Sequence, residues 1–268
     1  MSTENALSLD KPSPARMYDY FLHGDSNFPV DRQAGDLVIS RVGKTLTSDV
    51  VWENRRFLGR VVDHLAKRCG IRQFVDVGAG LPSMENTHQV ARRSIPDARV
   101  VYVDNDPAVA AYGRPLLTGD AAANVRIITA DVRAPAAILD HPDTRETIDF
   151  SEPVAVLFVA VLHFVRHSEN PHAIVEAFGS RMAAGSYLAI SHLATDRSPV
   201  EERRTMEGIY ENTTASMTYR DSGEITDFFR GFDILPPGVV PVGRWNPDER
   251  SGDSTNRMYG GVARKPED

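Results

Sequence analysis

Residues 74–82, with the sequence FVDVGAGLP, constrain the fold of this chain more than any other segment. An apolar run ends in Asp76 and then breaks into a Gly-Ala-Gly turn, where glycines allow a sharp bend and a close approach of the backbone to a ligand. A second apolar run, VVYVDNDP at residues 100–107, ends in Asp104. A strand, a glycine turn, a helix and a second strand ending in an acid form the nucleoside-binding half of a doubly wound α/β fold.

The glycine turn differs from a dinucleotide-binding loop in three ways. The third glycine of such a loop is absent, because Leu81, Pro82 and Ser83 follow the turn. Pro82 also removes one backbone N–H from the nest that would bind a pyrophosphate. Asp76 repels phosphate but suits an ammonium or sulfonium group. S-adenosylmethionine (SAM) has both cations and no phosphate, so the turn favours SAM; an NAD(P)-dependent oxidoreductase is the less favoured alternative.

Two further acids follow strands of the predicted sheet. Asp104 comes directly after VVYV, where it is placed to accept both ribose hydroxyls; its alternative role is to cap the next helix, which Asp106 could do equally well. Asp131, in TADVR, ends the third predicted strand. Its carboxylate could accept from an adenine amino group, with the Val132 N–H facing a ring nitrogen, or it could cap a helix. Both roles stay open for Asp131.

Composition excludes several classes of protein. A chain of 268 residues, 41% of them hydrophobic, can bury the core of a complete α/β sheet. The single cysteine, Cys69, rules out an internal disulfide and a cysteine-rich zinc site, and no histidines or carboxylates cluster at ligand spacing, so we expect no metal. A net charge of −7 argues against a nucleic-acid partner.

The sequence shows no targeting or membrane-spanning segment. The first twenty residues have neither a basic start nor an apolar stretch, unlike a signal peptide. The longest apolar run, residues 154–165, fits a central strand buried on both faces and is too short to cross a membrane. We therefore expect a cytoplasmic protein without membrane contact, and the sequence does not predict an oligomeric state.

The pattern of apolar residues divides the chain into three parts. Residues 1–13 are polar and predict a flexible tail, and residues 14–70 predict a cap of three helices. Residues 71–268 predict the SAM-binding domain. Strands alternate with helices up to residue 192, a polar helical insertion covers 194–221, and two late strands separated by a loop must pair antiparallel.

Several motifs together resemble a known class of enzyme. FVDVGAG, VVYVDNDP, ITADVR, the VLH after the fourth strand and the closing YGGVARK resemble the ordered motifs of class I SAM-dependent methyltransferases. From about residue 14 onward, PARMYDYFLHGDSNFPVDR, ENRRFL and IRQFVDVGAGLP resemble one bacterial family of SAM-dependent methyltransferases long catalogued as a domain of unknown function. The resemblance implies a Rossmann-like α/β fold with helices on both faces. Its seven-stranded, mostly parallel sheet would have the order 3-2-1-4-5-7-6, with strand seven antiparallel.

The resemblance also implies a cofactor site at the carboxyl edge of the sheet. The glycine turn would lie near the methionine part of SAM, the acid after strand two at the ribose, and the residues after strand three at the adenine. The candidate cofactor-binding residues of the sheet are Asp76, Gly78, Ala79, Gly80, Asp104, Asn105, Asp131, Val132 and Ala160.

Three residues outside these motifs are further candidates. Tyr18 in the cap could close over the cofactor, and Arg55 could reach the SAM carboxylate; ordinary packing or a surface ion pair is the alternative for each. His163 follows the fourth strand, where the methyl acceptor would approach. It could act as a general base, line the pocket, or be a buried structural histidine.

The sequence therefore predicts a SAM-dependent methyltransferase that acts on a small molecule by in-line displacement. The sulfonium already activates the methyl group, so the protein must mainly align the reactants and exclude water. The cap and the insertion at 194–221 would form the acceptor pocket, and aromatic residues such as Tyr210 and Tyr219 could favour an apolar acceptor. A SAM-binding regulatory or scaffold protein without turnover is the alternative.

Overall fold

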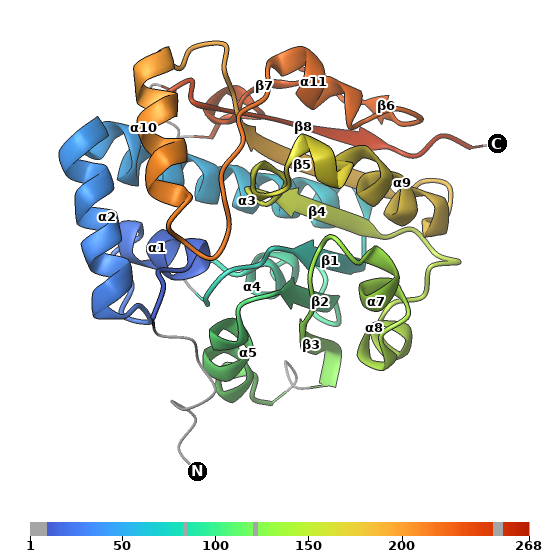
Figure 1. Cartoon of the computed structure of the whole chain (residues 1–268). Coiled ribbons are helices and arrows are strands. Elements are labelled where there is room, and N and C mark those ends of the chain that lie inside the picture. The colour runs from blue at the N-terminus through green and yellow to red at the C-terminus, as the bar shows by residue number, and fades with distance from the viewer. Residues whose placement is uncertain (1–9, 83–84, 120–122, 249–253, 268) are drawn as a thin grey trace.

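The computed structural model describes residues 10–82, 85–119, 123–248 and 254–267. Within these residues, eight strands form one mixed sheet with helices on both faces, as Figure 1 shows. The five parallel strands lie at the predicted apolar runs, although the fourth covers only the first part of the run 154–165. They are β1 (Gln73–Val77), β2 (Arg99–Asp104), β3 (Val125–Thr129), β4 (Ala155–Val159) and β5 (Tyr187–Leu193).

The strand order is β3-β2-β1-β4-β5-β8-β6, with β8 (Met258–Arg264) antiparallel to β5. This order confirms the arrangement implied by the resemblance. The expected sixth strand is split into β6 (Asp233–Ile234) and β7 (Val240–Pro241), and both pair antiparallel with β8. Pro236 and Pro237 lie between them and cannot donate ladder hydrogen bonds, which explains the interruption and the eighth strand.

Alternate residues of the central strands enter two separate cores. Phe74 and Leu157 pack with the helix α3 (Ser48–Cys69) on one face, whereas Val75 and Val156 pack on the other face. The short helices around the sheet agree with the predicted alternation of strands and helices. They are α4 (Thr87–Ala91), α5 (Pro107–Gly113), α7 (Pro135–Leu139), α8 (Pro142–Thr147) and α9 (Pro171–Arg181).

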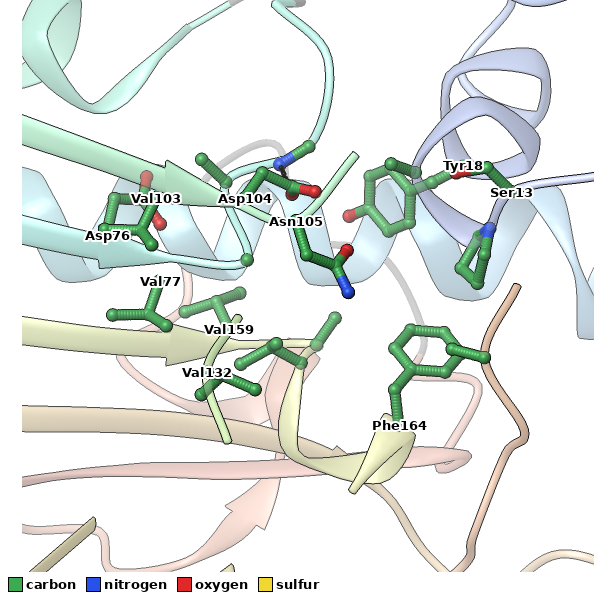
Figure 2. A pocket seen from close by; sticks show the side chains of 18 of the residues that line it. Ser13, Tyr18, Asp76, Val77, Val103, Asp104, Asn105, Val132, Val159 and Phe164 are labelled. Carbon is green, nitrogen blue, oxygen red and sulfur yellow. Dashed lines mark hydrogen bonds between the residues drawn. The ribbon is translucent and has the colours of Figure 1, made fainter. Parts of the chain in front are cut away.

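The N-terminal cap consists of α1 (Pro14–Phe21), α2 (Pro29–Val42) and α3, which match the three predicted helices. The long α3 packs against β4 and β8, and the buried Arg60 donates to the carbonyl oxygens of Val242 (2.7 Å) and Trp245 (3.0 Å). Figure 2 shows Tyr18 of α1 beyond the carboxyl ends of the strands that carry Asp76 and Asp104. The cap therefore covers the carboxyl edge of the sheet.

The insertion at 194–221 contains α10 (Val200–Tyr210), which packs against α2 beside the cap (Figure 1). The helix α11 (Ser222–Asp227) follows it. The Thr214 N–H donates to the Pro12 carbonyl at 3.0 Å, so the insertion is joined directly to the chain that leads into α1. None of the helices in the described ranges is long and apolar enough to cross a membrane.

Most of the tail expected at residues 1–13 lies outside the described residues. Its last residues are held in place: the buried Ser13 donates its N–H to Asp31 Oδ1 at 2.9 Å, and Pro12 accepts from Thr214. The anchored part of the chain thus begins before the expected boundary.

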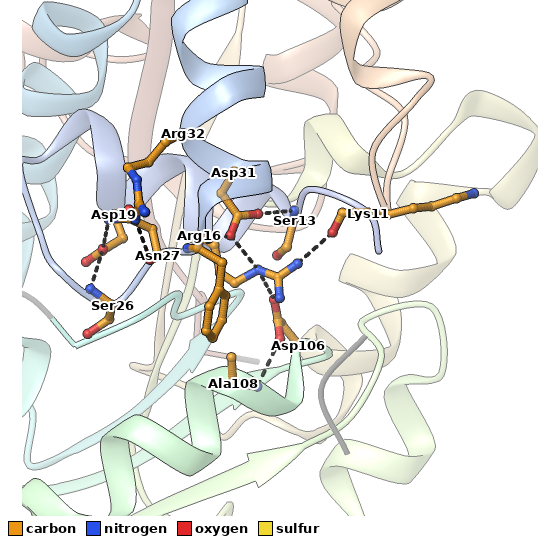
Figure 3. Close-up of polar contacts among 11 residues, drawn as sticks. Lys11, Ser13, Arg16, Asp19, Ser26, Asn27, Asp31, Arg32, Asp106 and Ala108 are labelled. Atoms are coloured by element: carbon orange, nitrogen blue, oxygen red, sulfur yellow. Dashed lines mark hydrogen bonds and ion pairs between the residues drawn. The ribbon is translucent and has the colours of Figure 1, made fainter. Parts of the chain in front are cut away.

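A buried arginine fastens the cap to the sheet, as Figure 3 shows. Arg16 is only 2% exposed, and its Nε lies 3.2 Å from Asp31 and 3.6 Å from Asp106. Its Nη2 donates to the Lys11 carbonyl at 2.7 Å, and its guanidinium lies over the Phe28 ring. Because Asp106 caps α5 while Asp31 lies in α2, this arginine joins the cap to the loop after β2.

We expect Arg16→Ala to lower the free energy of unfolding by about 3 kcal/mol or more, because it leaves the buried Asp31 without its cation. Urea denaturation followed by circular dichroism measures this change. Arg72→Ala is the matched control, because both side chains of the Arg72–Asp97 pair are more than half exposed and water screens their attraction, so stability should change much less. Equal effects of the two substitutions would contradict the role given to Arg16.

Candidate functional site

A pocket of about 920 Å³, including its open mouth, lies at the carboxyl ends of β1, β2 and β4 (Figure 2). The turn after β1 and the loops after β2, β3 and β4 form its floor, and α1, α3 and the insertion complete its walls. All of the predicted cofactor-binding residues except Asp131 line it. These are Tyr18, Arg55, Asp76, Gly78, Ala79, Gly80, Asp104, Asn105, Val132 and Ala160.

Both glycines of the turn have positive φ angles, but glycine is needed at each position for a different reason. Gly78 has φ +74°, and a Cβ there would lie 2.5 Å from the Val161 side chain. Gly80 has φ +67°, but a Cβ there would meet no atom within 4 Å. Gly78 is therefore required by close packing against the loop after β4, whereas Gly80 is required only by its backbone conformation.

Asp104 is buried at the end of β2 and accepts two main-chain hydrogen bonds. Its Oδ2 accepts from Gly80 N and its Oδ1 from Asp106 N, both at 2.9 Å. Burial raises the pKa of Asp104 to about 6, although these two bonds oppose the shift. Asp106 is the residue that caps α5, accepting from Ala108 N at 2.9 Å. Asp106 therefore takes the helix-capping role that was considered for Asp104.

Asp76 and Arg55 place opposite charges beside the glycine turn. Asp76 Oδ2 accepts from Thr87 Oγ1 at 2.6 Å, and burial raises the pKa of Asp76 while the nearby Arg55 opposes the shift. Arg55 reaches the pocket from α3 and donates to Asn86 Oδ1 at 3.2 Å. One end of the pocket therefore presents a carboxylate and a guanidinium together.

Asp131 is the predicted residue that does not line the pocket. The strand β3 ends at residue 129, so Asp131 lies in the following turn, where it accepts from Arg133 N at 2.9 Å and pairs with the Arg133 guanidinium at 3.1 Å. Its adenine role remains a prediction. Arg133 itself lines the pocket and donates to the Phe164 carbonyl at 2.6 Å. Arg133 belongs to the ITADVR motif, but its contact with Phe164 depends on a loop 31 residues away in the sequence.

A chain of hydrogen bonds connects the cap to the end of β4. The Ala160 N–H donates to Ser191 Oγ (3.0 Å), and that hydroxyl donates to Asn54 Oδ1 (2.6 Å). The Asn54 amide then donates to the Tyr18 hydroxyl (3.0 Å), which donates to the Val51 carbonyl (3.2 Å). Ala160 has φ +58°, so the chain holds an unusual backbone conformation at the pocket floor.

His163 lies behind the pocket and is not among its lining residues. It is 4% exposed and packs against the rings of Phe164 and His192, and burial lowers its pKa to about 3. Arg220 contacts Nε2 of His192 at 2.7 Å in the same cluster. The geometry favours the structural alternative for His163, and a catalytic role for it remains an untested prediction.

Sequence reasoning missed several residues at the end of the pocket nearest the cap. They come from the start of α1, the turn after β4 and the insertion. They are Ser13, Pro14, Ala15, Phe164, Thr214 and Ala215. Pro14 and Ala15 begin the PARMYDYFLHGDSNFPVDR motif, but the motif gave no reason to place them in the pocket. The expected aromatic residues of the insertion are buried instead, and Tyr210 supports Phe164 from behind at a ring distance of 5.9 Å.

Comparisons with known proteins agree with this geometry. The family model described as S-adenosyl methyltransferase matches residues 1–266. A provisionally assigned methyltransferase from Thermobifida fusca YX is 38% identical, with a TM-score of 0.91 over 99% of both chains. A DUF574 family protein from Streptomyces avermitilis MA-4680 is 37% identical, with a TM-score of 0.90 over 96% of this chain and 98% of that one.

More distant structures share the fold alone. An O-methyltransferase family protein from Burkholderia thailandensis is 14% identical, with a TM-score of 0.54 over 99% of this chain and 67% of that one. No curated protein sequence matches the chain. Fold and pocket thus define a class I SAM-dependent methyltransferase, with SAM as the methyl donor. The chain belongs to the S-adenosyl methyltransferase family, whose model covers almost all of it.

The two glycines give a first prediction for the site. Gly78→Ala should lower the free energy of unfolding by about 2–5 kcal/mol, since strain at positive φ adds to the contact with Val161. Gly80→Ala should cost only about 1–2 kcal/mol of strain. Urea denaturation of both variants measures the difference, and equal destabilisation would contradict the assigned packing.

The raised pKa of Asp104 gives a second prediction. If its ionised form accepts the ribose hydroxyls, affinity for the demethylated cofactor S-adenosylhomocysteine (SAH) is full above pH 6. It should fall by up to about tenfold per pH unit below it. The contribution of Asp104 to the stability of the free protein has the opposite sign: it falls as the pH rises from 3.8 through about 6. Calorimetric titration between pH 5 and 8 measures the affinity, and Asp104→Asn should remove the dependence.

Proposed function

We propose that this methyltransferase acts on a small-molecule acceptor, which it holds in the pocket between the carboxyl edge of the sheet and the cap. The observation that carries the proposal is the enclosure of this pocket. Its wall opposite the sheet is built from α1 and from Thr214 and Ala215 of the insertion, and the bond between Pro12 and Thr214 joins these segments. An acceptor must fit inside this enclosure, which favours a small molecule over a macromolecule.

The polar and charged groups of the pocket suit the chemistry of SAM. We assign Asp104 and its neighbour Asn105 to the ribose, where a buried carboxylate can accept from two hydroxyls. Asp76 would face the ammonium group and Arg55 the carboxylate of the methionine part. Val132 and the apolar wall around it would contact the adenine. Gly78 and Gly80 would let the backbone approach the cofactor closely.

The protein itself mainly has to orient and enclose the reactants. The sulfonium of SAM supplies a methyl group that is already activated for transfer. The Tyr18–Asn54–Ser191 chain fixes the cap against the floor, and the cap excludes water from the centre of the pocket. Holding acceptor and methyl group in line in this way can supply much of the rate enhancement.

Binding of SAH and of NAD to the purified protein tests the cofactor assignment. We expect SAH, but not NAD, to raise the melting temperature. Asp104→Asn should weaken SAH binding at least tenfold, because it removes a charge-assisted hydrogen-bond acceptor worth about 1.5–3 kcal/mol. Titration calorimetry measures the affinity, and circular dichroism verifies that the variant is folded.

Asp97→Asn is the control, because Asp97 is exposed and precedes β2, whereas the pocket lies at the carboxyl end of that strand. Unchanged SAH affinity in Asp104→Asn would remove Asp104 from the ribose site. Stabilisation by NAD rather than SAH would overturn the assignment of the pocket as a whole.

A further inference from the structure

We propose that the acceptor is a flat aromatic molecule with an acidic hydroxyl or thiol, which enters the pocket already deprotonated because the enzyme supplies no base. This inference rests on the proposed function and narrows it to a substrate class. It follows from where the pocket carries charge, and from how the polar side chains at its acceptor end are already bonded.

The carboxylates that line the pocket are confined to the part that we assign to the cofactor. They are Asp76 and Asp104, at the ends of β1 and β2, with Arg55 beside them on α3. The fourth charged lining residue, Arg133, donates to the Phe164 carbonyl, and a guanidinium cannot serve as a base. The opposite end is formed by residues 13–15, Tyr18, Phe164 and residues 214–215. Among the described residues that line this end, Tyr18 is the only one that can exchange a proton near neutral pH or above.

The Tyr18 hydroxyl is not free to act as a base. Its proton is donated to the Val51 carbonyl, and one of its lone pairs accepts from the Asn54 amide. The amide cannot turn round, because Asn54 Oδ1 accepts from the buried Ser191 hydroxyl. Burial also raises the pKa of Tyr18, so its phenolate is not present at neutral pH.

The remaining titratable groups nearby are also unsuitable as bases. His163 is separated from the pocket by its own turn, and with a pKa of about 3 it cannot retain a proton at neutral pH. We assign Asp104 to the ribose and Asp76 to the ammonium group of the cofactor, so neither carboxylate faces the acceptor. The acceptor therefore has to lose its proton to water before it reacts.

The shape and polarity of the acceptor end favour a flat apolar molecule. Figure 2 shows the rings of Tyr18 and Phe164 projecting into the pocket from α1 and from the turn after β4. Phe164 is held in place by Tyr210 behind it. Pro14, Ala15 and Ala215 add apolar surface. An aromatic acceptor can stack on these rings at the usual centroid separations.

The chemistry balances without a proton acceptor. A lone pair of the ionised oxygen or sulfur forms a bond to the methyl carbon while the carbon–sulfur bond of the donor breaks. The electron pair of that bond goes to the sulfur, which loses its positive charge, and the anionic acceptor becomes a neutral ether or thioether. The attraction between anion and sulfonium is strong in a pocket shielded from water, which compensates for burying the anion.

Three probes test this inference on the intact protein: 4-nitrophenol and thiophenol, which ionise near neutral pH, and phenol, which ionises only near pH 10 as tyrosine does. We expect 4-nitrophenol and thiophenol to bind the SAH complex, measured by calorimetry. With SAM, their methylation rates, followed by SAH release, should rise with pH to the pKa of each probe and then level. At pH 7.5, phenol should react at least about 100-fold more slowly, in line with its ionised fraction.

Two variants test separately whether Tyr18 acts as a base and whether Phe164 binds the acceptor. Tyr18→Phe should leave the pH midpoint for each probe unchanged. Phe164→Ala should weaken probe binding at least tenfold and leave SAH affinity within twofold. Tyr112→Ala, at an exposed ring outside the pocket, is the control for Phe164→Ala.

The outcomes distinguish this inference from the proposed function. A single pH midpoint for all probes that disappears in Tyr18→Phe would show that the enzyme supplies a base and would overturn the inference. Equal rates for phenol and 4-nitrophenol at pH 7.5, or no probe binding to the SAH complex, would also overturn it. Failure of the protein to bind SAH would instead overturn the cofactor assignment on which the inference rests.

Discussion

Two main-chain hydrogen bonds to the buried Asp104 carboxylate hold the site together. The bond from Gly80 joins the glycine turn after β1 to the end of β2, and the bond from Asp106 fixes the loop that follows β2. Burial of the acid is unfavourable, as its raised pKa shows, and the two N–H donors offset part of that cost. Asp106, which donates one of these bonds, also caps α5 and lies near Arg16 of the cap. The position of the cap thus depends on the same loop that forms the cofactor site.

Much of the sheet could be predicted because its signals are local. Each parallel strand is a short apolar run bounded by turn residues, and the acids and glycines of the site follow directly on β1 and β2. The order of the strands came from the resemblance to a known class, since periodicity alone does not say which strands are neighbours. The sequence also contains the cause of the split in the sixth strand, because Pro236 and Pro237 interrupt it. The two resulting strands raise the number in the sheet to eight.

The acceptor end could not be predicted because it is made by contacts between distant segments. Asn54 and Ser191 are 137 residues apart, and Arg133 reaches Phe164 across two loops. His163 and Phe164 are adjacent in sequence, yet only Phe164 lines the pocket, because the turn after β4 directs the histidine into the core. Asp131 illustrates the same limit: a strand that ends two residues earlier leaves its carboxylate with Arg133 instead of among the lining residues.

The cofactor end of the pocket is built from strand ends, and the acceptor end from contacts between distant segments. The two ends therefore differ in how well they tolerate substitutions. Residues at the strand ends are fixed by the ladder and by bonds such as those to Asp104, so a substitution there disturbs the fold and the cofactor together. The acceptor end depends on the start of α1, one turn and the insertion, which meet through the bond between Pro12 and Thr214. Since that bond uses only main-chain atoms, the side chains around it can vary while the enclosure persists. The architecture therefore permits a change of acceptor without loss of the methyl donor, provided that the cap and the insertion remain joined.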